Sequence, residues 1–328
     1  MEFFRFYSGL QFFTLPRMHL LNSLLPIFLI IALGKILCQT GFFSDHLAKS
    51  LNRLTYWIAL PALLIDKVSS ATFNSGDVSR LSLLLVLATI GSALTAYTAT
   101  FILKLDRRST GAFVQGSMRS NNAFIGLPVI IYSMSMLHPD IAALATVALA
   151  PSILFYNFLS VLILVIHGDR QKRSPGTTIL LFMKQLLLNP LLIACALGLL
   201  LNGLKIALPS AIQSTLKALG DTSLALALLS IGASLSFKGI RTGLAASVTA
   251  AGIKVFVQPL IGLGLAVLWN IPPVERQILL IYLACPTAVA SYVMADIFNS
   301  DRDLAAHIIV ISTLLSIVSL AAVLALGG

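Results

Sequence analysis

Two polar, proline-containing stretches interrupt apolar segments at corresponding places in the two halves of the sequence. The first reads RSNNAFIGLP and runs from Arg119 to Pro128; the second reads CPTAVAS and runs from Cys285 to Ser291. Together they offer a guanidinium group, amides and hydroxyls, and neither contains an acidic residue. Because every backbone N–H and C=O in a bilayer needs a partner, such breaks persist where they line a cavity. A matched pair of them predicts the substrate site of a transporter.

Each break is expected to place a helix N-terminus inside the membrane. Proline favours the first position of a helix, so Pro128 and Pro286 are expected to begin the second halves of their helices. Such an end presents unpaired N–H groups and about half a positive charge, and two ends facing each other would bind an anion. The candidate substrate-binding residues are therefore Arg119, Asn121, Asn122, Gly126, Pro128, Pro286, Thr287 and Ser291.

The charge beside the first break favours an anionic substrate. A sodium/proton antiporter of similar architecture would need acidic groups at the crossing, whereas this sequence has Arg119 there. A cation inside the membrane is costly and by default functional. Two structural alternatives stay open: the Arg119 side chain extends to the lipid headgroups, and Asn121 caps a helix or bonds to a neighbouring one.

A second set of polar residues, Asp221, Lys254 and Gln258, is a candidate coupling or support site. Asp221 either caps the N-terminus of a helix or carries a proton. Lys254 and Gln258 are four residues apart and share a helix face, where Lys254 pairs with Asp221, holds an anion or packs between helices. The sequence has neither metal-ligand spacing nor a catalytic motif, so we expect no enzyme activity, cofactor or metal.

The composition is that of a polytopic membrane protein. Hydrophobic residues make up 58% of the 328 residues and charged residues 10%, against about 25% charged in soluble domains. The predicted fold is all-α, with about ten transmembrane helices, of which the second, fourth, seventh and ninth are interrupted. The apolar ranges are 20–38, 44–65, 81–103, 110–136, 140–166, 178–202, 215–236, 243–269, 275–298 and 304–326.

The two halves are predicted to be inverted repeats of five helices. Pro26–Gly34 and Pro190–Gly198 share the pattern Pro-x5-Ala-Leu-Gly at an offset of 164 residues. An odd number of helices turns the second repeat over, so the broken helices four and nine would cross near the membrane midplane. The predicted segments are an N-terminal extension (1–17), a first repeat (18–167), a short cytoplasmic linker (168–176) and a second repeat (177–328).

Basic residues set the expected orientation. Thirteen Lys and Arg fall near the predicted inside ends and seven near the outside ends, which places both termini outside a plasma (inner) membrane. The net charge of +10 then reflects contact with anionic lipid, and nucleic-acid binding is not expected, since no basic run exceeds a few residues. Met18 is an alternative start to Met1.

At these motifs the sequence resembles the auxin efflux carrier family of secondary transporters, which includes plant auxin exporters and bacterial malonate or malate carriers. The resemblance implies a scaffold of helices, a mobile core that contains the crossing helices, and an elevator-type motion that carries a carboxylate. The family's crossover asparagine would fall on Asn121 or Asn122. The matching stretches are Leu51–Pro61, Arg119–Pro128, Asn189–Ile193, Leu228–Leu235, Lys254–Pro259 and Pro286–Tyr292.

Two features depart from the plant exporters. Cys285, Pro286 and Thr287 stand where those exporters have an asparagine at the crossing of helix nine. Their long central loop is also absent, and the short loop of this sequence is similar to that of the bacterial carriers. The resemblance therefore implies a carboxylate carrier without a specific auxin pocket.

The expected function is a secondary carrier or facilitator for a small organic anion; malate, malonate, lactate and an indole acid fit equally well. Proton or sodium coupling and a homodimer are compatible with it. One alternative is a sodium-coupled symporter resembling the bile acid type, which would want further acidic or amide oxygens near the crossing. Others are a sensor and a membrane-embedded enzyme; the latter would show a His, Asp, Ser or Cys constellation at one membrane face, and none is evident.

Overall fold

The computed structural model of the chain describes residues 25–71, 75–135, 140–168, 187–235 and 243–327, which form an all-helical fold. Each of the ten predicted apolar ranges contains helix. Within the described ranges the only β-type contact is an isolated bridge between Ser120 and Thr287. The predicted extension (1–17) and the linker beyond Gly168 lie outside the described residues.

The chain order of the helices follows the predicted ranges closely. In the first half the helices are Leu25–Gln39, α2 (Asp45–Leu54), η1 (Thr55–Ala59), α3 (Leu60–Ser69), α4 (Ser75–Ile102), α5 (Arg107–Met118), η2 (Asn122–Gly126), α6 (Leu127–Met134) and α7 (Ile141–His167). In the second half they are α9 (Pro190–Gly203), α10 (Ser210–Ser234), α11 (Leu244–Gly252), η4 (Ile253–Val257), α12 (Gln258–Leu268), α13 (Pro273–Ala284), α14 (Ala290–Ile297) and α15 (Arg302–Gly327). The three η segments are single π-helical turns.

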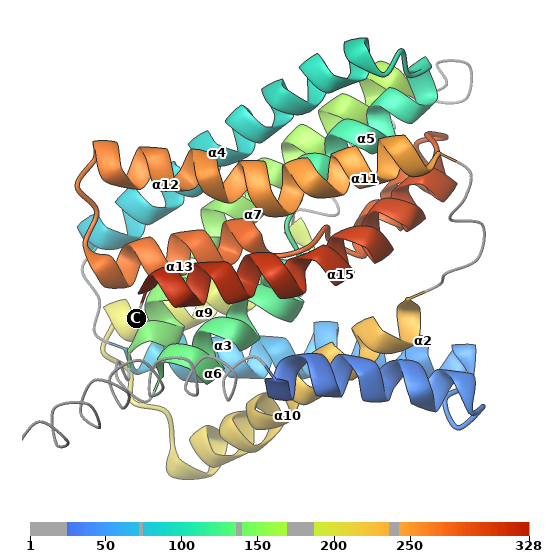
Figure 1. Cartoon of the computed structure of the whole chain (residues 1–328). Helices are drawn as coiled ribbons and strands as arrows, with labels where there is room; N and C mark the ends of the chain where they lie inside the picture. The colour runs from blue at the N-terminus through green and yellow to red at the C-terminus, as the bar shows by residue number, and fades with distance from the viewer. Residues whose placement is uncertain (1–24, 72–74, 136–139, 169–186, 236–242, 328) are drawn as a thin grey trace, which may run out of the picture.

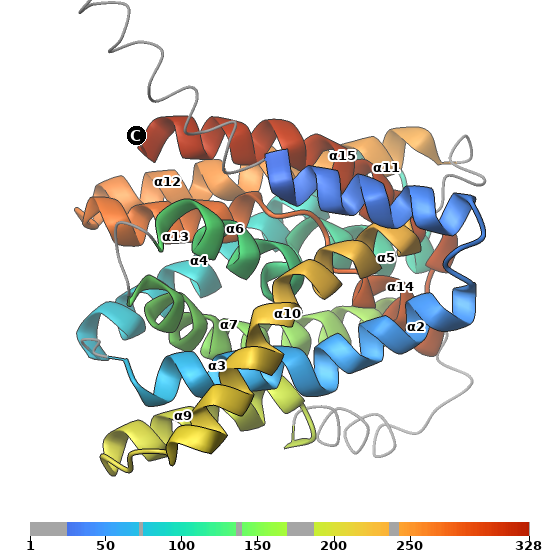
Figure 2. The ribbon, with the colours of Figure 1, turned by 90° about the horizontal axis from the view of Figure 1, so that it is seen from below.

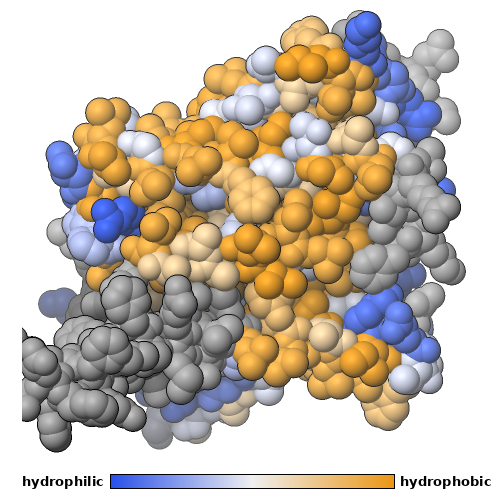
Figure 3. Space-filling model, in the orientation of Figure 1, coloured by the Kyte–Doolittle hydropathy of each residue, from blue (hydrophilic) through white to orange (hydrophobic). Residues whose placement is uncertain are grey.

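Several helices have the length and apolarity that a bilayer requires. Apolar residues form a broad band across the face shown in Figure 3, and hydrophilic residues gather at its two edges. The chain is therefore an integral membrane protein. Among the described residues, the five helices long and apolar enough to cross a membrane are Gly76–Ile102, Ile141–His167, Ser210–Ser234, Leu244–Leu268 and Arg302–Leu326.

Each π-helical turn ends two residues before a proline: Pro61, Pro128 or Pro259. A proline ring inside an α-helix clashes with the carbonyl group four residues earlier. The wider π turn, in which the N–H bonds to the carbonyl five residues back, relieves this clash and lets the helix continue. The second predicted helix is thus continuous through Pro61, and α10, the seventh, is also continuous. The predicted interruptions of these two helices are wrong, whereas the fourth and ninth are broken.

The helices form two groups. The panel, which lies along the bottom of Figure 1 and faces the viewer in Figure 2, consists of Leu25–Gln39, α2–η1–α3, α9 and α10. The remaining helices form the crossover group. Contacts concentrate within each group: α3 packs on α9 and α10, whereas α15 packs on α11 and α13. The two groups meet where α7 contacts α3 and α9, and where η2 contacts α10.

Glycines allow the panel helices to approach closely. A Cβ atom at Gly34 would lie 2.2 Å from the carbonyl oxygen of Leu229 in α10. A Cβ atom at Gly198 of α9 would lie 2.9 Å from the Cβ of Val68 in α3. Gly34 and Gly198 end the two copies of the Pro-x5-Ala-Leu-Gly pattern, so the same motif position makes a close helix contact in each half.

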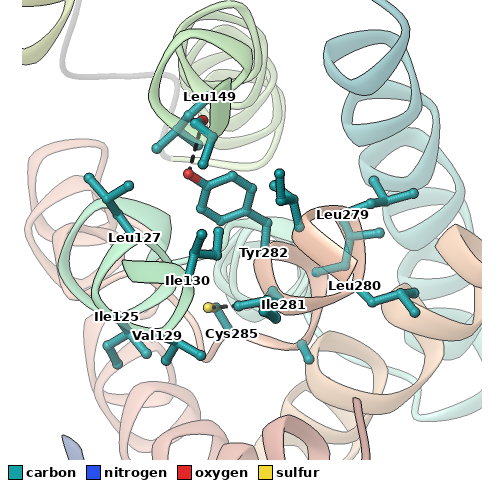
Figure 4. Packing of buried hydrophobic residues seen from close by; sticks show 14 of the residues in the cluster. Ile125, Leu127, Val129, Ile130, Leu149, Leu279, Leu280, Ile281, Tyr282 and Cys285 are labelled. Carbon is teal, nitrogen blue, oxygen red and sulfur yellow. Dashed lines mark hydrogen bonds between the residues drawn. The ribbon is translucent and has the colours of Figure 1, made fainter. Parts of the chain in front are cut away.

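An apolar core lies between α7 and one half of each broken helix, α6 of the fourth and α13 of the ninth (Figure 4). Tyr282 is fully buried there and donates its hydroxyl hydrogen to the carbonyl oxygen of Ala145 at 3.0 Å. Gly126 leaves room for this ring, because a Cβ atom at that position would lie 2.6 Å from Tyr282 Cδ1. Gly126 has helical backbone angles. Gly126 therefore serves the packing of this ring.

The close approach at Gly34 predicts a stability effect. Gly34→Ala should destabilise the protein by about 1–3 kcal/mol, because the methyl group meets backbone that cannot move aside. Gly264→Ala is the matched control: it lies within α12 with nothing within 4 Å of the added methyl, so its thermal midpoint should not fall. Thermal unfolding of the purified protein in detergent measures both. Equal midpoints for Gly34→Ala and the wild type would contradict the packing.

Candidate functional site

The two broken segments cross each other and share backbone hydrogen bonds. α5 ends at Met118 and α13 ends at Ala284, and the extended residues that follow run antiparallel. The Asn121 N–H donates to the Pro286 carbonyl at 2.8 Å, and the Ala288 N–H donates to the Arg119 carbonyl at 2.9 Å. Each break thus supplies partners for the other, as a membrane interior requires.

Side chains satisfy the carbonyl groups that the end of α5 leaves unpaired. The Thr287 hydroxyl donates to the Gly116 carbonyl at 2.7 Å, and the Gln258 amide donates to the Met118 carbonyl at 3.1 Å. The hydroxyl of Ser92, in α4, donates to the Ser117 carbonyl. Thr287 and Gln258 therefore hold the broken helix; neither lines the cavity described below.

The end of α13 is satisfied in the same way. Lys254 is fully buried and donates its ammonium hydrogen to the Leu283 carbonyl at 2.7 Å, and Ser319 donates to the Ala284 carbonyl at 3.0 Å. A hydrogen-bond donor is favourable here because the last carbonyl groups of a helix have no partner within the helix. The predicted pairing of Lys254 with Asp221 is not present. Asp221 is exposed in the middle of α10, eleven residues after that helix begins, so the predicted N-terminal cap is also wrong.

The second halves of the broken helices begin away from the predicted prolines. The π turn η2 begins at Asn122, six residues before Pro128, and α14 begins at Ala290, four residues after Pro286. The proline prediction is wrong because the π turn carries Pro128 inside a continuous helix and Pro286 lies in the extended segment. Asn121 is the residue before η2, and its side chain makes no capping hydrogen bond, so the cap alternative is also wrong.

A cavity of about 290 Å³ lies where the crossing faces the panel. Its walls contain two arginines and several amides, hydroxyls and aromatic rings, and no acidic residue lines it among the described residues. The panel contributes Asn52, Arg53, Tyr56, Trp57, Asn189, Leu191, Ser230, Ile231 and Ser234. The crossover group contributes Arg119, Ser120, Asn121, Asn122, Ala123, Phe124, Ile153, Tyr156, Asn157, Ala288, Val289, Ala290 and Val293.

Arg119 is the one charged side chain of the cavity that is also buried, with 7% of its surface exposed. Its Nη2 donates to Asn157 Oδ1 at 2.8 Å, its Nη1 contacts Met294 Sδ, and its guanidinium carbon lies 5.8 Å from the centre of the Tyr156 ring. The alternative that Arg119 extends to the headgroups is therefore wrong. These three partners are all neutral, so the charge of the guanidinium is not compensated by the described residues of the cavity.

The structure brings three of the predicted substrate-binding residues together at the cavity: Arg119, Asn121 and Asn122. Asn122 Oδ1 is buried without a hydrogen-bond partner among the described residues. The other predicted residues lie elsewhere: Thr287 and Pro286 hold the crossing, Gly126 and Pro128 pack, and Ser291 is buried away from the cavity lining with its Oγ unpaired within the described chain.

The sequence analysis did not identify Asn157, Asn189 and Tyr56, which line the cavity from outside the two breaks. Asn157 is the one amide side chain in the apolar helix α7, which was a usable signal. Asn189 lies before Pro190, where it caps α9 by accepting from the N–H of Leu191 at 3.0 Å. Tyr56 in η1 and Phe124 in η2 stack across the boundary between the two groups, with ring centres 6.5 Å apart. The spacing of residues in the sequence does not indicate where the panel meets the crossover group.

Comparisons with known proteins agree over nearly the whole chain. Residues 19–324 match the model of a family described as membrane transport protein. A protein of Methanothermobacter thermautotrophicus described as an uncharacterized transporter is 25% identical over 306 residues, which cover 91% of this chain and 95% of that protein. A second uncharacterized transporter, from Methanocaldococcus jannaschii, is 24% identical over 307 residues, which cover 92% and 96%.

The hydrogen bond from Thr287 to the Gly116 carbonyl predicts that Thr287→Val destabilises the protein. The cavity lining should not change, because Thr287 is not part of it. The substitution keeps the shape and leaves the buried Gly116 carbonyl unpaired, which should cost about 1–3 kcal/mol. Thr98→Val is the control, because the exposed Thr98 hydroxyl bonds only to the preceding turn of its own helix. Thermal unfolding of both variants tests this, and an unchanged midpoint for Thr287→Val would contradict the role of the hydroxyl.

Proposed function

Because the chain belongs to this family of membrane transport proteins, that of the auxin efflux carriers, we propose that it is a secondary carrier of a small organic anion. The observation that carries the proposal is the buried Arg119 guanidinium at a cavity without an acidic lining residue in the described chain. A buried cation is stable when an opposite charge compensates it. A bound carboxylate supplies that charge, and the amides of Asn121 and Asn122 lie on the same wall.

The proposed mechanism is movement of the crossover group along the panel. The cavity has one wall on each group, so such a movement changes which walls face the substrate. Arg119, Asn121 and Asn122 travel with the crossing, whereas Arg53 stays on the panel. Lys254 and Gln258 support the motion because they link the continuous helix α11–η4–α12 to both breaks, so that the crossing moves as one unit. This is an elevator-type alternating access.

The helix contacts support ten membrane crossings arranged as two inverted repeats. The two copies of the proline–glycine pattern make equivalent contacts with a helix of the other half, Gly34 with α10 and Gly198 with α3. The broken helices take the fourth place in each half and cross each other. In the proposed orientation, with both termini outside, the exposure of Arg53 and Ser234 supports a cavity mouth on the cytoplasmic side.

Uptake of radiolabelled malate, malonate, lactate and indole-3-acetate into proteoliposomes tests the proposal. The wild type should take up at least one of them saturably. Arg119→Gln should lower that uptake at least about 30-fold, because the charge that attracts the carboxylate is gone. Asn121→Ala and Asn122→Ala should each lower it about tenfold or less through lost hydrogen bonds. Imposed proton and sodium gradients identify any coupled ion.

Arg302→Gln is the matched control, since this arginine is exposed on α15 and bonds to Asp296 away from the cavity. Its uptake should equal that of the wild type. The proposal is wrong if the folded wild type moves none of the four anions. It is also wrong in its site if Arg119→Gln transports as well as Arg302→Gln.

A further inference from the structure

Asn157 accepts a hydrogen bond from the buried Arg119, where a buried arginine would normally pair with a carboxylate. Its Oδ1 accepts a hydrogen bond from Arg119 Nη2 at 2.8 Å, and its side chain is half-buried in the cavity wall. The other contacts of the guanidinium are the sulfur of Met294 and the face of Tyr156. Arg119 Nε is buried without a partner among the described residues. The arginine is thus held in place and left charged.

An amide and a carboxylate at this position would differ in charge and hardly in shape. Both have an oxygen that accepts from a guanidinium, and both occupy nearly the same volume. Only the carboxylate cancels the positive charge, and a cancelled charge no longer attracts an anion. α7 has no acidic or basic residue from Ile141 to His167 other than its terminal histidine, so nothing else on that helix takes the role.

Asn157 and Arg119 also belong to the same moving body. Asn157 lies on α7 and Arg119 at the end of α5, and these helices pack on each other within the crossover group. The hydrogen bond therefore survives a movement along the panel. The pair presents the same charge to the substrate on both sides of the membrane.

We propose that Asn157 is the residue that fixes the charge of the transported substrate: it orients Arg119 and, by being neutral, leaves the substrate to compensate the guanidinium. This inference rests on the proposed function and deepens it. In Asn157→Asp, the new carboxylate would compensate the charge of Arg119 in place of the substrate. The site would then favour a neutral analogue of the substrate over the anion.

The test compares each acid with its neutral amide in proteoliposomes. The probes are lactate and lactamide, malonate and malonamide, and indole-3-acetate and indole-3-acetamide. The wild type should prefer the acid, and Asn157→Asp should lower the ratio of acid to amide uptake at least about 30-fold. Asn157→Leu, which loses the hydrogen bond without adding charge, should weaken uptake and keep the preference for the acid. Asn270→Asp adds the same charge at an exposed position outside the cavity lining and should change the ratio less than about threefold.

If Asn157→Asp does not fold, a negative charge can be attached chemically to residue 157 of the folded protein. Asn157→Cys is reconstituted and treated with a sulfonate-bearing or an uncharged methanethiosulfonate, with the treated wild type as control for Cys38, Cys195 and Cys285. Only the sulfonate should abolish acid uptake.

The outcomes separate the two proposals. If the wild type transports an acid and Asn157→Asp keeps the same ratio, the role of Asn157 is wrong and the carrier function stands. The role is also wrong if Asn157→Leu reverses the preference or if both thiol reagents act alike, because the effect is then one of shape. If the wild type transports no acid, both proposals fail.

Discussion

The structure depends on one constraint: two helices are broken inside an apolar protein, and every backbone group they release needs a partner. The crossing meets it by pairing the breaks with each other, through Asn121 and Pro286, and by directing the side chains of Thr287, Gln258 and Lys254 at the helix ends. Threonine, glutamine and lysine are mostly surface residues in proteins, whereas these three side chains are buried. At the crossing their hydrogen bonds allow the carbonyl groups at the helix ends to lie inside the protein, beside a cavity.

The same constraint explains why the cavity is charged as it is. The side chains of Thr287, Gln258 and Lys254, which pair with the helix ends, do not line the cavity. Arg119 and Asn122 do line it, and Asn122 Oδ1 has no hydrogen-bond partner within the described chain. Since the described lining contains no acidic residue, the Arg119 guanidinium gives the cavity a positive charge. The fold and the charge of the cavity therefore have a common origin in the break after Met118.

Much of this was predictable from the sequence, and particular residues show where prediction stopped. Proline and polar residues within apolar runs located both breaks, and the uncompensated Arg119 indicated an anion. The π turns made Pro61 and Pro128 compatible with continuous helices, so the helix starts were misplaced. Asn157 and Tyr56 come from helices whose sequence is regular; only tertiary packing brings them to the cavity. Lys254 was recognised as unusual, but its partner is a carbonyl group, which no sequence pattern reveals.

The central claim is that an organic anion binds beside Arg119, and fluorescence tests it most directly. Trp57 lines the cavity, and Trp269, the other tryptophan, lies at the end of α12. In a Trp269→Phe background, titration with carboxylates should change the Trp57 emission saturably, their amides should not, and Arg119→Gln should abolish the response. A carboxylate response that persists unchanged in Arg119→Gln, or no saturable response to any carboxylate in the folded protein, would contradict the account.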